Sequence, residues 1–169
     1  YLDRVAHRLK FNYDLRRGKR VGGERFPLYG RLLVESHKQF LHPGLDYANQ
    51  RAEEHLFARR VGRVGVDDVE RYADLGNDLA DDWVEPDEEH RGTEFTFVLV
   101  AATLPDDVHT FVEGFRDRTL IRFGYHGHYE VNIAVVAPDE KAHAASHNAD
   151  VWRAFATWAD GEPAEESAG

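Results

Sequence analysis

Cysteine is absent from this 169-residue chain, and its absence excludes several classes of protein at once. Without thiols there is no disulfide framework, no cysteine nucleophile, no iron–sulfur cluster and no thiolate zinc site. A chain of this length buries roughly 70% of its unfolded surface on folding, so it needs no covalent or metal staple. Because the lack of cysteine also fits a reducing compartment, we expect a cytoplasmic protein.

Long apolar runs are absent as well. No segment approaches the roughly 18 apolar residues that a membrane span requires. The first ten residues carry charges at every turn and have no apolar core, unlike a signal peptide. We therefore expect a soluble protein without a membrane partner.

Lysine is scarce, with four lysines against seventeen arginines, and acidic residues outnumber basic ones by 31 to 21 for a net charge of −10. Carboxylates stay hydrated in concentrated salt and keep molecules apart. The apolar stem of lysine, in contrast, is driven towards burial by strong salt. This composition predicts a halophilic protein, and the alternative is an ordinary acidic protein from a GC-rich genome, which also favours arginine.

Positive charge is concentrated at one end of the chain. Residues 1–65 carry a net charge of +7, whereas residues 66–169 carry −17. Salt adaptation explains the acidic part and gives no reason for the basic part. The last nine residues are acidic and lack large apolar side chains, so we expect a single domain over 1–160 and a disordered tail over 161–169.

The spacing of apolar residues predicts alternating helices and strands. Helical spacing occurs at 2–9, 67–84, 105–115 and 149–159, and strand-like patterns occur at 26–34, 56–64, 94–102 and 129–137. The basic segment 16–24 contains three glycines, so it is predicted to be a loop.

The predicted order of elements is α-β-β-α-β-α-β-α. It indicates an α/β (or α+β) protein with a single mixed sheet of about four to five strands and helices packed on it. The strand at 94–102 is apolar on both faces, which favours a central position. The helix between this strand and the one at 129–137 is long enough for a crossover between parallel strands.

Two histidines and a glutamate form the densest chemical cluster of the sequence. On a regular strand, His126, His128 and Glu130 would point to one face. Two imidazoles and a carboxylate suit zinc, iron or manganese. The alternative is a turn at Gly124 and Gly127, which would break the alternation and leave the histidines in solvent.

A second polar cluster lies between the long helix and the central strand. His90 and Glu94 could join the first cluster in one metal site, or belong to a solvated acidic loop. A divalent metal ion is therefore the alternative to the expectation that the protein has no cofactor.

The basic residues of the first part form a third candidate site, for nucleic acid or another anion. They are Arg16, Arg17, Lys19, Arg20, Arg59, Arg60 and Arg63. Arginines flanked by aromatic side chains are typical of nucleic-acid binding. Because the Debye length is only about 3 Å at 1 M salt, such binding would depend on close bidentate contacts. The alternative is internal pairing with acidic residues of the second part, such as Asp67, Asp68, Asp81 and Asp82.

Two resemblances add to this reading. The segments 29–32, 95–98, 115–120 and 124–130 resemble a family of small uncharacterised haloarchaeal proteins, which implies a source and no function. The predicted topology is similar to that of restriction-endonuclease-like nucleases, which use an acidic residue and Glu-x-Lys to hold Mg²⁺. The central strand here reads Val-Leu-Val-Ala-Ala over 98–102. This second resemblance, without Glu-x-Lys, implies a binding protein rather than an enzyme.

The sequence as a whole predicts a non-catalytic interaction or regulatory protein of a halophilic archaeon, with a protein or nucleic-acid partner. One alternative is a metal-dependent hydrolase or nuclease that uses the His/Glu cluster. Another is a nucleic-acid-binding protein that uses the basic part. Spacing leaves open whether Trp152, Phe155 and Trp158 lie in the core or form a dimer contact.

Overall fold

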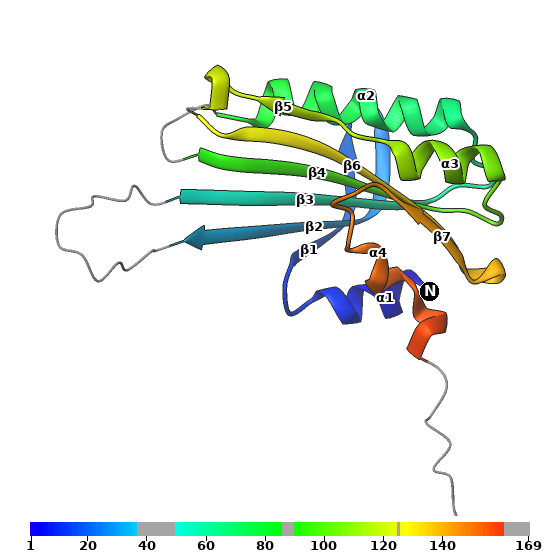
Figure 1. Ribbon diagram of the computed structural model, residues 1–169. Helices are drawn as coiled ribbons and strands as arrows, with labels where there is room; N and C mark the ends of the chain where they lie inside the picture. Colours follow the sequence, from blue (N-terminus) through cyan, green and yellow to red (C-terminus); the bar gives the residue numbers. More distant parts are fainter. Residues whose placement is uncertain (37–49, 86–89, 125, 161–169) are drawn as a thin grey trace, which may run out of the picture.

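The computed structural model describes residues 1–36, 50–85, 90–124 and 126–160, which form one open mixed sheet with helices on both faces (Figure 1). The tail predicted over 161–169 lies outside these residues. The helices are α1 (Leu2–Leu9), α2 (Val66–Trp83), α3 (Asp106–Gly114) and α4 (Trp152–Phe155). The strands are β1 (Asp14–Val21), β2 (Glu24–Ser36), β3 (Gln50–Arg60), β4 (His90–Val100), β5 (Arg118–Leu120), β6 (His128–Ala137) and β7 (Ala142–Ala145).

The strand order is β1-β2-β3-β4-β6-β5, and β7 pairs with β6. The first three strands form an antiparallel meander, whereas β3, β4 and β6 run parallel to one another. The parallel pairing of β4 with β6 confirms the predicted crossover through α3. The side chains of register partners on β3, β4 and β6 point to the same face of the sheet.

Each face of the sheet has its own apolar core. Between α2, α3 and the sheet, Phe57 and Phe97 are fully buried with their rings stacked 5.1 Å apart. On the other face, Leu56 and Val98 pack against α1 and α4, together with Phe155. Spacing left open whether Phe155 lies in the core or forms a dimer contact, and its burial places it in the core.

The helices on the two faces cover different amounts of the sheet. Figure 1 shows α2 and α3 lying along one face, while α1 and α4 lie together under one end of the other face. Within the described residues, no helix covers the remaining half of that face, near the end of β2 and the start of β3. We call this region the open half of the sheet. The described helices include none that is both long and apolar enough to cross a membrane.

The sequence predicted the mixed α/β class, but it underestimated the sheet, which has seven strands in the described residues instead of four to five. The prediction of a loop at 16–24 was wrong, because β1 occupies most of it and joins β2 through a tight hairpin. The turn residues Gly22 and Gly23 both have positive φ, which suits a two-residue hairpin loop. Since β1 is an edge strand, its charged side chains meet solvent and lack the apolar alternation of a buried strand.

Other elements differ from the prediction in extent. β3 starts at Gln50 and ends at Arg60, so the strand predicted at 56–64 was displaced. β5 and β7 were missed because three and four residues are too few to show a period. The predicted last helix is a single turn of α4 followed by a 3₁₀ segment, Thr157–Asp160.

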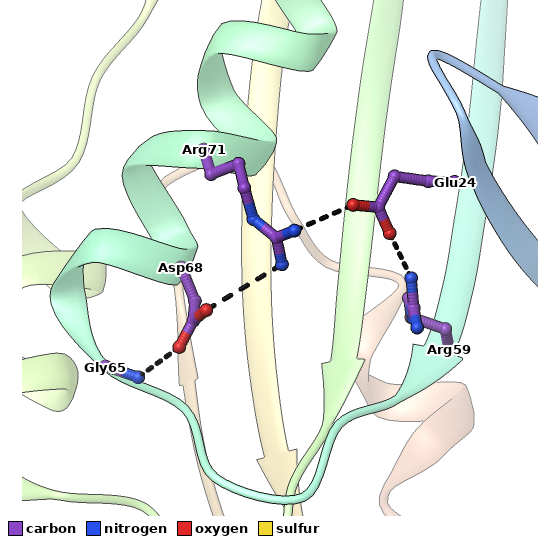
Figure 2. A network of polar contacts seen from close by, with 5 residues as sticks. All are labelled: Glu24, Arg59, Gly65, Asp68 and Arg71. Atoms are coloured by element: carbon purple, nitrogen blue, oxygen red, sulfur yellow. Dashed lines mark hydrogen bonds and ion pairs between the residues drawn. The ribbon is translucent and has the colours of Figure 1, made fainter.

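A polar network fastens the first hairpin to α2, as Figure 2 shows. Glu24, at the start of β2, accepts hydrogen bonds from Arg59 of β3 and from Arg71 of α2, the latter at 2.7 Å. Arg71 also lies 3.7 Å from Asp68, whose carboxylate accepts a bond from the Gly65 amide at 2.8 Å and so caps α2. One carboxylate thus joins three elements that are distant in the sequence.

We expect Glu24→Gln to destabilise the protein by about 1 kcal/mol, because one carboxylate serves two arginines and is only partly exposed. The loss should shrink as salt rises from 0.1 to 1 M, since screening weakens ion pairs near the surface. Urea unfolding at the two salt concentrations measures it. Glu70→Gln, an exposed position on α2, is the control, and an equal effect in both variants would contradict the role of the network.

Candidate functional site

The open half of the sheet carries two rows of side chains that run across five strands. Strand register places the members of each row side by side on neighbouring strands. The first row is Leu32, Glu54, Glu94, Glu130 and Arg118. The second row is Val34, Ala52, Gly92, His128 and Leu120. Adjacent strands lie roughly 4.8 Å apart, so the first row holds three carboxyl groups as direct neighbours.

The three carboxyl groups of the first row, which we call the glutamate row, lie where the open half meets the half covered by α1 and α4. The hydroxyl of Tyr13, just after α1, donates to Glu54 at 2.8 Å. The amide of Asn148, shortly before α4, donates to Glu130 at 2.8 Å. These neutral donors orient the outer carboxylates of the row without neutralising their charge.

Burial raises the pKa of two members of the glutamate row, Glu54 and Glu94. Burial is the largest cause that raises the pKa of Glu94 to about 7, and the charges of Glu54 and Glu130 raise it further. Burial also raises the pKa of Glu54, against hydrogen bonds from Tyr13 and Thr96 that favour the charged form. The pKa of the middle carboxyl thus lies well above its ordinary value, in the direction that favours the protonated form.

The second row leaves a hollow beside these carboxyl groups. Gly92 has no side chain, and the His128 ring lies over it so closely that a Cβ there would be 2.8 Å from Cε1. Its neighbour Ala52 has only a methyl group, so the side chains in the middle of the second row are short. The result is a cavity of about 220 Å³, lined by Leu32, Val34, Ala52, Glu53, Glu54, Arg91, Gly92, Glu94 and His128.

The residues predicted for a metal site are only partly brought together. Glu94, Glu130 and His128 share the open half of the sheet, whereas His126 precedes β6 and is separated from it by Gly127, which has a φ of +83°. His90 begins β4, and its side chain lies outside the described part. Among the described residues, no three His, Asp or Glu side chains are placed to hold a metal ion.

The seven basic residues predicted to bind an anion are distributed over both faces of the sheet. Lys19 lies over the Tyr29 ring on the α2 face, whereas Arg60 lies over the Tyr1 ring on the α1 face. The α2 face carries Arg16, Lys19 and Arg59, and the α1 face carries Arg17 and Arg60. Arg20 lies at the hairpin, and Arg63 follows β3.

Within the described residues, three of these basic residues form ion pairs with acidic partners in the same part of the chain. Arg17 pairs with Asp3 at 2.9 Å and Arg16 with Asp14 at 3.5 Å. The partners of these three residues differ from the four aspartates suggested by the sequence. The nucleic-acid alternative stays a prediction.

His55, which the sequence did not single out, is buried on the face of β3 opposite the glutamate row. Its Nδ1 is 2.7 Å from the Tyr29 hydroxyl, and its Nε2 is 3.1 Å from a Glu53 carboxylate oxygen. Because a carboxylate only accepts, Nε2 of His55 carries the proton and the tyrosine donates to Nδ1. Burial lowers the pKa of His55 to about 4. The neutral ring, stacked on Phe95, is a satisfied polar link within the core.

Among known protein families, one family model matches residues 1–157 of the chain. The chain belongs to the family described as a domain of unknown function (DUF8052). The match includes all the helices and strands named above, and therefore both cross-strand rows of the DUF8052 domain. No curated protein and no solved structure matches the chain. The resemblances to haloarchaeal proteins and to nucleases stay predictions.

Glu54 is the functional candidate of this DUF8052 domain that the sequence analysis overlooked. A signal was present, because Ala52, Glu54, Leu56 and Ala58 alternate with His55 and Phe57, which would have extended the strand back to Gln50. The position of Glu54 directly beside Glu94 depends on strand register, which no local pattern encodes.

Proposed function

We propose that this DUF8052 domain is an interaction protein that binds a small organic ligand in the cavity on the open half of its sheet. The cavity itself carries the proposal: Leu32, Val34 and Ala52 supply apolar surface, and Glu54 and Glu94 converge on the same space. Sites for small ligands are concave and largely apolar, with a few polar groups that fix orientation. Perturbed titratable groups also cluster at functional sites.

The energetics of the glutamate row support the same proposal. Like charges directly opposite one another on neighbouring strands are destabilising. A sheet that only had to be stable would carry apolar or mixed-charge partners at Glu54, Glu94 and Glu130. Places where a sequence departs from the locally stable choice are most often sites of function.

The proposal narrows the interaction protein predicted from the sequence to one with a small-molecule partner. It does not use the basic residues of β1, whose exposed charges also protect an edge strand from pairing with other chains. The halophilic source and the cytoplasmic location remain predictions from composition.

Filling the cavity should abolish ligand binding. We expect members of a panel of small cationic, neutral and anionic compounds to raise the melting temperature of the wild type by about 4 °C at ten times their Kd. Ala52→Phe places a ring over Gly92 and should remove this shift. Differential scanning fluorimetry on both proteins measures the effect.

Ala102→Phe is the matched control, because it puts the same ring into a different hollow, of about 460 Å³, beside Tyr1 and Arg60. Compounds that bind at the proposed site should stabilise this variant as they do the wild type. Shifts that survive in Ala52→Phe, or that disappear only in Ala102→Phe, would place the ligand elsewhere. No shift with any compound at millimolar concentration would contradict the proposal.

A further inference from the structure

The charge around the cavity is unbalanced towards the negative. The glutamate row brings three carboxyl groups together, and two of them, those of Glu54 and Glu94, line the cavity. Two arginines lie close by: Arg91 lines the cavity, and Arg118 is the register partner of Glu130 at the far end of the row. Glu53 also lines the cavity, but its carboxylate lies on the opposite face, where it pairs with Arg31 at 2.5 Å.

In the middle of the glutamate row, Glu54 and Glu130 each raise the pKa of Glu94 more than Arg118 lowers it. The donors to the outer members are a phenol and an amide, which carry no charge. Arg118 is one strand away from Glu94, because Glu130 lies between them. A positively charged group in the cavity would meet Glu54 and Glu94 together, in partly buried surroundings where charge–charge attraction is stronger than in water.

The other side of the cavity is apolar. Leu32 and Val34 come from β2 and Ala52 from β3, and the Val34 side chain remains half exposed. A ligand with an apolar body would bury this surface, at roughly 25 cal/mol per Å². One side of the cavity thus favours a positively charged group, and the other side favours an apolar group of the same ligand.

We propose that the cavity selects an organic cation, with its ammonium group on Glu54 and Glu94 and its apolar body against Leu32, Val34 and Ala52. This inference rests on the proposed function, because it names the chemistry of the ligand at the same site. Anions are repelled by the glutamate row. Neutral molecules of the same shape gain the apolar contact and lose the ionic one.

Three probes of one shape and different charge test the inference: benzylamine, benzyl alcohol and benzoate. Isothermal titration calorimetry at pH 7.5 and constant salt should show benzylamine binding at least tenfold more tightly than benzyl alcohol, and no binding of benzoate. Glu94→Gln should weaken benzylamine at least tenfold and leave benzyl alcohol within about twofold. Glu70→Gln, on the opposite face, should bind all three probes as the wild type does.

The outcomes separate this inference from the proposed function. If benzyl alcohol or benzoate binds as tightly as benzylamine and Ala52→Phe abolishes it, the cavity is a ligand site and the inference is overturned. Benzylamine binding that Glu94→Gln leaves unchanged overturns the inference too, because the ammonium would then lie elsewhere. Stoichiometric Mn²⁺ binding without any benzylamine binding overturns it in favour of a metal ion. If none of the three probes binds, the inference fails, whereas the proposed function is decided by the wider panel.

Discussion

Glu94→Gln should make the protein more stable at pH 8, by on the order of 2 kcal/mol, and should have little effect at pH 4.5. Burial and two neighbouring carboxylates raise the pKa of Glu94 from its ordinary value of 4.5 to about 7. Ionising this side chain therefore costs more in the folded protein than in the unfolded chain. Glutamine has nearly the same shape and carries no charge.

The sign of the pH dependence follows from proton binding. Between pH 4.5 and 7 the folded state holds more of the Glu94 proton than the unfolded state, so this group lowers stability as pH rises through that window. His55 acts in the opposite direction, because its pKa is lowered to about 4 and the unfolded chain binds its proton first. The difference between wild type and Glu94→Gln cancels the His55 contribution and leaves the contribution of Glu94 together with its coupling to Glu54 and Glu130.

Urea unfolding of both proteins at pH 4.5, 6 and 8 measures this difference. Glu70→Gln removes an exposed carboxylate from α2, and its stability should follow the wild type at every pH. If Glu94→Gln is less stable than wild type at pH 8, the ionised form of the glutamate row stabilises the folded protein. That result would also weaken the case for the site, because the row would then have a structural reason to exist.

Phe97→Ala should lower the free energy of unfolding by about 3–5 kcal/mol, a large part of the 5–15 kcal/mol typical of a domain. The ring is fully buried between the sheet and α2. It stacks on Phe57 and lies 5.8 and 5.9 Å, between ring centroids, from Tyr72 and Phe26. Alanine would leave a cavity in this aromatic layer and remove its ring contacts.

Thermal and urea unfolding test the Phe97 prediction, with an expected fall in melting temperature of roughly 10 °C. Phe11→Ala is the same substitution at a side chain that is 83% exposed, and it should change stability by no more than about 0.5 kcal/mol. Similar losses in the two variants would mean that the ring of Phe97 is not the centre of the core.

Elements with a strong apolar period were predictable from the sequence. α2 was predicted at 67–84 and spans Val66–Trp83, because its apolar stripe faces the sheet and its other side is acidic. The central position of β4 followed from its being apolar on both faces. β1 could not be recognised in this way, since an edge strand has little to bury, and β5 and β7 depend on pairing with β6 more than on their own residues.

The candidate site was predictable only in fragments. His128, Glu130 and Glu94 were singled out as chemically interesting, and they do share one face of the sheet. Their expected partner His126 is turned out of the strand by the backbone at Gly127. Glu54 was absent from the prediction, although it is the neighbour of Glu94 on β3.

By itself, the sequence determined what this chain can bury and what chemistry it lacks. It excluded thiol chemistry, indicated the mixed α/β class, and divided the charge into a basic and an acidic part, because composition and local periodicity are properties of the chain alone. Only the tertiary structure decided that Glu54, Glu94 and Glu130 stand in one row. The register of β3, β4 and β6 fixes that arrangement, and a shift of one residue on any of these strands would turn its glutamate to the other face.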